Sequence, residues 1–269
     1  MPRPWICSLC CAGTLGSPRT PSRSTAAPST NNTPPAVGAR KRRGTRKRAP
    51  RIDAAIAMEF SRRLRAWFRR EQRDLPWRRT RDPYEVLVSE LMLQQTQVSR
   101  VLEFYPRFLS SFPTVHALAS ATPKRVREAW DGLGYYARAR NLHALAKHVT
   151  RGPRDGALPS HPDDLRALPG IGAYTAGAVA SFAYERRTAA VDTNVARVLT
   201  RVFAPTLDPK RPRDLTALWT VAERVLPRTG KATWVHNQAV MELGALVCTA
   251  RIAHCDVCPV RSCCKTGRR

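Results

Sequence analysis

Apolar residues recur at helical spacing through nearly all of the chain from residue 55 onward, and this periodicity constrains the fold more than any other feature. The clearest stripe places Phe60, Leu64, Trp67 and Phe68 on one face of a helix, with arginines around the other face. Further stripes follow in residues 87–102, 124–130, 141–149, 173–182, 195–202 and 215–226. No pair of segments alternates polar and apolar residues around a two-residue turn. We therefore predict an all-α protein of many short helices with Pro- or Gly-marked connections.

The charge of the chain is strongly positive and unevenly distributed. Lys and Arg number 46 against 20 Asp and Glu, a net charge of +26, which favours nucleic acid as the partner and an anionic membrane surface second. No apolar run is long enough to cross a bilayer. Residues 1–52 hold nine Arg, two Lys, eight Pro and no acidic residue. We predict a disordered basic arm over residues 1–54, with a misassigned start site or a transit peptide as alternatives.

A glycine-rich turn lies between two helical stripes near residues 164–182. It reads Leu-Pro-Gly-Ile-Gly over residues 168–172. Gly170 and Gly172 allow the backbone to approach a ligand closely, and the N–H groups that open the second helix are left unpaired. Such a turn binds phosphate, so we interpret it as a DNA-binding helix-hairpin-helix rather than an ordinary turn.

Two carboxyl groups stand in contrasting positions. Glu90 shares a helix face with Val86, Leu87 and Leu93, where burial would raise its pKa and keep it protonated. Asp192 precedes a helical stripe, where an N-terminal position would keep a carboxylate ionised. A protonated acid and an ionised carboxylate are what general-acid cleavage of a glycosidic bond requires. Each residue alone also has a simpler interpretation, as an exposed helix residue and as a helix cap.

The cysteines gather near the two ends of the chain. Cys248, Cys255, Cys258 and Cys264 are separated by six, two and five residues, a spacing that indicates a metal site. Structural zinc usually takes two short Cys pairs, so the single short pair favours an iron–sulfur cluster over zinc. Cys263 is a fifth candidate, and we interpret Cys7, Cys10 and Cys11 as incidental.

These motifs together resemble the MutY-type adenine DNA glycosylases of the endonuclease III superfamily. They occur in family order: LPWR at 75–78, SELMLQQTQV at 89–98, GLGYYARARNL at 132–142, the hairpin at 168–172, VDTNV at 191–195 and the Cys spacing. The resemblance spans residues 58–264. It implies two helical lobes with a cleft, a [4Fe-4S] cluster on the four Cys, and excision of adenine mispaired with guanine or 8-oxoguanine.

The resemblance also assigns roles in the chemistry. Glu90 matches the acid that protonates adenine N7, and Asp192 matches the carboxylate that stabilises the oxocarbenium ion, with Asn194 assisting around the sugar. Tyr174 stands where the bifunctional glycosylase/lyases of the superfamily carry their Schiff-base lysine. A phenol cannot form that imine, so a monofunctional hydrolase is implied.

Other matched positions concern the DNA. Trp77 and Arg78 resemble residues that line the adenine pocket, and Glu242 is expected to hydrogen-bond the base. Gln95 and Tyr135 match positions that intercalate into the duplex when the target nucleotide is extruded. Without the resemblance, these two would be interpreted as a helix-surface amide and a core aromatic residue.

The expected organisation has three parts: the arm over 1–54, a helical glycosylase body over 55–246 and a cluster loop with tail over 247–269. The longer relatives continue past the cluster into a NUDIX-like domain that reads 8-oxoguanine, whereas this sequence ends five residues after Cys264. That difference puts the preference for 8-oxoguanine over guanine in question. We expect a bacterial, cytoplasmic, nucleoid-associated monomer. The alternatives are a mismatch or pyrimidine glycosylase of the same superfamily and a catalytically silent DNA-binding module.

Overall fold

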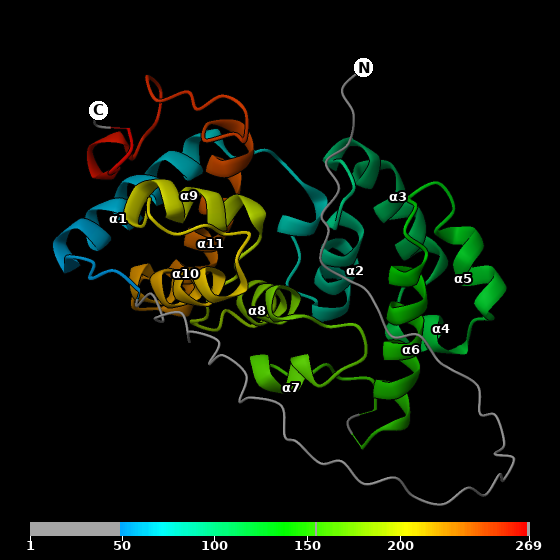
Figure 1. The fold of residues 1–269 in the computed structure, drawn as a ribbon. Coiled ribbons are helices and arrows are strands. Elements are labelled where there is room, and N and C mark those ends of the chain that lie inside the picture. Colours follow the sequence, from blue (N-terminus) through cyan, green and yellow to red (C-terminus); the bar gives the residue numbers. More distant parts are fainter. Residues whose placement is uncertain (1–48, 154, 268–269) are drawn as a thin grey trace, which may run out of the picture. The chain divides into compact units, whose positions relative to one another are not determined.

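The computed structural model describes residues 49–153 and 155–267, which fold almost entirely into helices (Figure 1). These residues contain no strand, only one isolated bridge between Cys248 and Ala253. The elements in order are α1 (Ala54–Glu71), the 3-10 turn η1 (Pro76–Arg78), α2 (Pro83–Leu93), α3 (Val98–Ser111), α4 (Val115–Ser120), α5 (Pro123–Ala129), α6 (Ala137–Arg151), α7 (Pro162–Arg166), α8 (Ala173–Phe182), α9 (Thr193–Phe203), α10 (Pro212–Val225), α11 (Gly230–Leu246) and the 3-10 turn η2 (Arg261–Cys263). The predicted all-α class is confirmed. The predicted arm lies outside the described residues except for 49–54.

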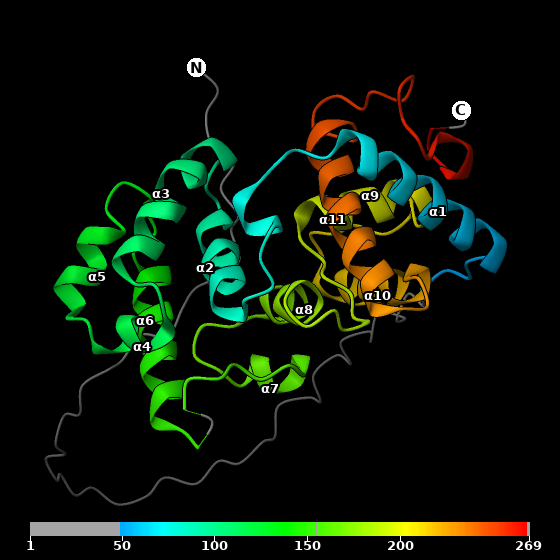
Figure 2. The same cartoon turned by 180° about the vertical axis from the view of Figure 1, so that it is seen from behind.

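Two separate hydrophobic cores organise these helices. One core is formed by α2 to α6 with α8, around the fully buried Phe108 and Trp130. The other is formed by α1, α9, α10 and α11, around Phe60 and Leu64. Figures 1 and 2 show the helices of each core gathered together when seen from the front and from behind. The helix α8 contacts both α2 of the first core and α11 of the second.

The helix starts follow from local capping. Asp53, Asp82 and Asp192 each accept backbone N–H groups at the start of α1, α2 and α9. Pro83 occupies the first turn of α2, where its missing N–H has no consequence. No helix of the described residues is long and apolar enough to cross a membrane.

Two features differ from the predicted pattern. The stripe over residues 87–102 is broken, because α2 ends at Leu93 and α3 begins at Val98. Gln95 between them has a φ of 58°, a left-handed conformation that interrupts a right-handed helix. The helices α4 and α11 match none of the predicted stripes. The buried face of α11 includes His236, Asn237 and Glu242, and these polar residues obscure the apolar periodicity by which helices are detected.

Candidate active site

Glu90 lies on α2 as a buried acid, as its apolar helix face predicts. Its side chain is only 4% exposed, and Tyr174 on α8 donates a hydrogen bond of 2.6 Å from its phenol to Oε2. Burial raises the pKa of Glu90 to about 7, against the lowering effect of the Tyr174 hydrogen bond; the nearby Asp192 raises this pKa further and Arg78 lowers it, both to a lesser extent. A carboxyl group with this pKa can hold and release a proton at neutral pH.

Tyr174 is the second residue of α8, directly after the glycine hairpin. Burial, and then the charges of Glu90 and Asp192, raise its pKa well above the ordinary value, so the phenol keeps its proton and acts as a donor. The position of α8 depends on a close contact between its backbone at Gly177 and the backbone of Ala189. A Cβ on Gly177 would collide with the carbonyl oxygen of Ala189, so only glycine lets α8 lie against the segment that leads to Asp192.

Asp192 is the N-cap of α9. Its Oδ1 accepts the Val195 N–H at 2.6 Å and its Oδ2 accepts the Asn194 Nδ2–H at 3.0 Å. The side chain retains some solvent exposure, yet desolvation is the largest influence on it and raises its pKa, against the opposing effect of these hydrogen bonds and Arg197. Arg197 in turn donates to Asn194 Oδ1 at 2.7 Å, which fixes the amide that orients Asp192.

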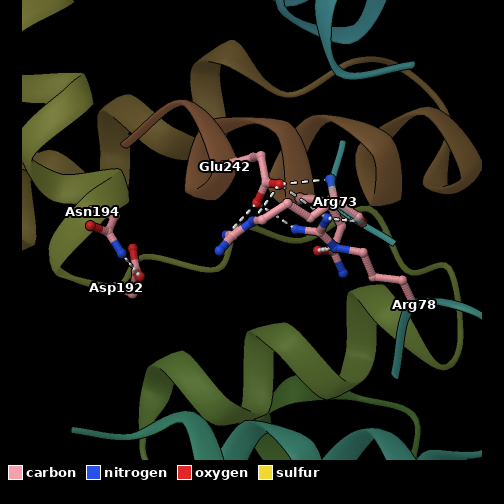
Figure 3. A network of polar contacts seen from close by, with 6 residues as sticks. Arg73, Arg78, Asp192, Asn194 and Glu242 are labelled. Carbon is pink, nitrogen blue, oxygen red and sulfur yellow. Dashed lines mark hydrogen bonds and ion pairs between the residues drawn. The ribbon is translucent and has the colours of Figure 1, made fainter. Parts of the chain in front are cut away.

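Glu242 on α11 is almost fully buried and is held by two arginines (Figure 3). Its Oε1 accepts the Arg73 backbone N–H at 3.0 Å and Nε–H at 2.9 Å, and its Oε2 accepts from Arg73 Nη2 at 2.7 Å and Arg78 Nη2 at 2.8 Å. Burial alone would raise the pKa of Glu242, but these hydrogen bonds lower it to about 2. Both oxygens are thus engaged by protein donors, whereas the sequence predicted a contact with the base.

Arg73 is a site residue that the sequence did not reveal. It lies in the loop between α1 and η1, 169 residues from its partner Glu242. Nothing in the local pattern distinguishes it from the many exposed arginines of this chain. Arg78, which was predicted, also donates to Gln238 Oε1 at 3.0 Å and stacks over the Phe68 ring at 5.2 Å.

Trp77 and the two predicted intercalating residues occupy different environments. Trp77 is 6% exposed and packs edge-on against Tyr105 in the first core, with ring centroids 5.6 Å apart. Gln95 and Tyr135 are exposed, in the loops that precede α3 and α6, and neither takes part in the described hydrogen bond of Glu90. Their φ angles of 58° and 47° lie in the left-handed region that non-glycine residues seldom adopt.

The glycine hairpin has the geometry that its sequence predicts. Gly170 has a φ of 75°, and a Cβ there would meet Asn141 Cβ at 2.6 Å, so no other residue fits. Ile171 is buried between two exposed glycines. Gly172 is the N-cap of α8 and offers no side chain to the first-turn N–H groups, which leaves these donors available to an anion.

Cys248, Cys255, Cys258 and Cys264 share one neighbourhood after α11. Burial first, and then the thiols of the other three, raise the pKa of Cys258 to about 11. None of the four forms a disulfide. Arg201 Nη1 donates to Cys248 Sγ at 3.2 Å, and the Gly267 N–H donates to Cys264 Sγ at 3.2 Å. Donors directed at sulfur fit the charge of a thiolate-bound cluster, although no group of three or more His, Cys, Asp or Glu in the described residues is arranged to hold a metal ion.

Comparison with known proteins gives the family. Residues 88–222 match the HhH-GPD superfamily base excision DNA repair protein model. The chain is 46% identical over 202 residues to an adenine DNA glycosylase of Mycolicibacterium smegmatis, covering 74% of this chain and 67% of the relative. It is 42% identical over 226 residues to the adenine DNA glycosylase of Rattus norvegicus, covering 81% of this chain but only 43% of the relative. The chain therefore spans less than half the length of that relative.

Solved structures show the same fold. A thermostable thymine-DNA glycosylase superposes with a TM-score of 0.72 at 28% identity, covering 80% of this chain and 99% of its own. A trapped endonuclease III–DNA covalent intermediate superposes with a TM-score of 0.68 at 21% identity, covering 81% of this chain and 98% of its own. The chain belongs to the HhH-GPD superfamily of base excision DNA repair proteins, in its group of MutY-type adenine DNA glycosylases.

Proposed function

We propose that this protein is a monofunctional DNA glycosylase that hydrolyses the N-glycosidic bond of adenine mispaired with guanine or 8-oxoguanine in duplex DNA. The relatives named adenine DNA glycosylase support the substrate. The observation that carries the chemistry is the buried Glu90, with a pKa of about 7, hydrogen-bonded to a tyrosine where a lyase of this superfamily would need lysine.

Glu90 is the general acid in this proposal. Adenine leaves a sugar poorly as an anion, so protonation of the base at N7 weakens the glycosidic bond. Burial keeps enough of Glu90 protonated at neutral pH for this task. Tyr174 cannot supply the proton in its place, because its own pKa is raised well above its ordinary value, and it serves to hold the carboxyl group.

Asp192 stabilises the positive charge that develops on the deoxyribose as the bond breaks. Its two hydrogen bonds, from the Val195 backbone and the Asn194 amide, fix the carboxylate before the charge appears. Water then attacks the sugar carbon and gives an abasic site. Tyr174 offers no amine for an imine, so the strand stays intact.

Backbone N–H groups bind the DNA phosphates, and two side chains intercalate between the bases. The first-turn N–H groups of α8 bind a phosphate, and the positive charge of the chain adds a salt-dependent attraction. Extrusion of adenine leaves a gap that Gln95 and Tyr135 fill, since both are exposed. Trp77 and Arg78 form one wall of the base pocket. Glu242 contributes by fixing Arg78, because its own oxygens are occupied.

Cys248, Cys255, Cys258 and Cys264 would hold a [4Fe-4S] cluster. A cluster bound there would crosslink four points of the segment that follows α11, a structural role rather than a catalytic one. Arg201 and the Gly267 N–H would then donate to ligated sulfur. Iron and acid-labile sulfide in the purified protein, with visible absorbance that zinc lacks, are the expected results. Zinc without iron would refute the cluster.

The activity is tested with duplexes that carry adenine opposite guanine, adenine opposite 8-oxoguanine, and thymine opposite guanine. We expect alkali-dependent cleavage of the adenine strand, and none before alkali. Glu90→Gln should abolish excision and keep mismatch binding, whereas Glu128→Gln, at an exposed position of α5, should leave both unchanged. Strand breaks before alkali would contradict the monofunctional reaction. Removal of thymine alone would favour a thymine glycosylase, in line with the structural similarity to one.

A further inference from the structure

Arg138, in the first turn of α6, is a buried arginine whose bonds go to backbone carbonyls rather than to an acid. Its side chain is 8% exposed, and no carboxylate of the described residues lies within ion-pair distance. Burial lowers its pKa to about 10, so it remains a cation at neutral pH. A buried charge needs compensation from hydrogen bonds. The two terminal nitrogens of the guanidinium obtain it from the end of α2 and from two loops, whereas its Nε has no hydrogen-bond partner.

The first loop joins α2 to α3. Arg138 Nη1 donates to the carbonyl oxygens of Leu91 and Met92 in the last turn of α2, each at 2.9 Å, and to that of Gln94 in the loop itself. Nη2 donates to Thr96 Oγ1 at 3.1 Å. These contacts lie on both sides of Gln95, so they hold the loop at the point where that residue takes its left-handed conformation.

The second loop precedes α6. Nη2 of the same guanidinium donates to the carbonyl oxygens of Leu133 and Gly134, each at 3.2 Å. Tyr135 follows directly, also in a left-handed conformation, and its ring lies 5.3 Å from the Arg138 guanidinium carbon. Among the described residues no other side chain donates hydrogen bonds to both loops: Trp130 and Arg100 bind only the second one.

We infer that Arg138 is a positioning residue that holds Gln95 and Tyr135 at a fixed separation, so that both side chains enter the same base step of the duplex together. Arg138 itself touches no base. Its planar fork donates to six acceptors from two terminal nitrogens, more than the three N–H groups of a lysine ammonium can serve with one donor each. The consequence for catalysis rests on the proposed function. The fixing of the two loops by Arg138 is independent of that function.

Hydrogen exchange on the free protein tests the fixing of the loops without any substrate. In Arg138→Met we expect faster amide exchange in residues 94–97 and 132–135 and unchanged exchange in the hairpin at 169–172. Arg140→Met is the matched control, because it removes an exposed charge from the same helix. Arg138→Lys keeps the charge and should loosen at least one of the two loops. If either Arg138 variant keeps wild-type exchange in both loops, the inference is wrong.

Base extrusion tests the consequence. With 2-aminopurine in place of the target adenine, Arg138→Met should slow the fluorescence rise at least about tenfold, the worth of one hydrogen bond to a charged group. Arg138→Lys should not restore the rate. Excision of adenine from single-stranded DNA, which needs no extrusion, should stay within about twofold of the wild type in the same variants.

The outcomes separate the two proposals. If the wild-type protein removes no adenine from any duplex, the proposed function fails, while hydrogen exchange still decides whether Arg138 fixes the loops. If duplex and single-stranded excision fall equally in Arg138→Lys, the residue supports the fold as a whole and does not position the intercalating pair. Should Arg138→Met fail to fold, Arg138→Lys alone carries both measurements.

Discussion

Replacing Glu90 by glutamine should remove a pH dependence from the stability of the protein. The pKa of Glu90 is about 7 in the folded protein, and its ordinary value is 4.5. Between these values the folded state keeps a proton that the unfolded chain has lost, so the free energy of unfolding falls as pH rises. The full shift corresponds to about 3 kcal/mol, of which about 2 kcal/mol falls between about pH 5.5 and about pH 8.5.

Urea unfolding of the wild type and Glu90→Gln at several pH values across this window measures the effect. Glutamine keeps the shape of the side chain and still accepts the Tyr174 hydroxyl, so the carboxyl charge is the main difference. The difference in unfolding free energy, variant minus wild type, should therefore increase steadily with pH and level off near pH 8. Titrating groups that do not interact with Glu90 are common to both proteins and cancel in the difference.

Glu128→Gln is the matched control, because its side chain on α5 is 63% exposed. Its stability difference from the wild type should be small and the same throughout the pH range. Parallel curves for the wild type and Glu90→Gln would show that burial does not displace the Glu90 titration. The assignment of Glu90 as a proton-holding acid would then have lost its physical basis.

Further predictions concern the reaction and the packing around it. Single-turnover excision should fall by up to tenfold per pH unit above about pH 7, as Glu90 loses its proton; a flat profile to about pH 9 would contradict this. Tyr174→Phe removes a hydrogen bond that lowers the pKa of Glu90, so the loss of excision with rising pH should begin at a higher pH than in the wild type. A loss that begins at a lower pH would contradict this effect of the hydrogen bond. Asp192→Asn should change the free energy of unfolding by less than about 1 kcal/mol, since both residues cap helices well. The excision rate should fall by orders of magnitude because the negative charge is lost. A fully active variant would show that the charge of Asp192 is not needed. Gly177→Ala should cost at least about 1–3 kcal/mol in thermal or urea unfolding through overpacking, whereas Gly172→Ala, with open space around it, should cost little.

The all-α class could be predicted from local periodicity. The same periodicity suggested a buried Glu90 but left an exposed helix residue as the alternative, and the family motifs decided between them. The cap at Asp192 and the turn at Gly170 were predictable, since each is determined by a few neighbouring residues. Most helical stripes appeared as helices, but α4 and α11 were missed. The helix α4 has only six residues, and the buried face of α11 is rich in polar side chains.

Contacts between segments far apart in the sequence could not be predicted from local periodicity and motifs. Arg73 and Glu242 are 169 residues apart, and the sequence pattern of either one is that of an ordinary charged residue. The same holds for Glu90 and Tyr174, separated by 84 residues. Only the resemblance to a family had brought those two together. A periodicity shows which face of a helix is buried, but it does not show which other helix covers that face.

Because Tyr174 lies in the first turn of α8, this helix fixes the distance between its own N-terminal amides and the Tyr174 hydroxyl. The first turn of α8 carries both the unpaired amides, which we propose bind a phosphate, and the Tyr174 hydroxyl, which donates to Glu90. In the proposed function, the distance between the bound phosphate and the Tyr174 hydroxyl is therefore set by the backbone geometry of one helical turn. A single residue inserted between Gly172 and Tyr174 would rotate the phenol by about 100° and shift it by about 1.5 Å. The phosphate-binding amides and the hydroxyl that holds Glu90 would then no longer be aligned with the same nucleotide.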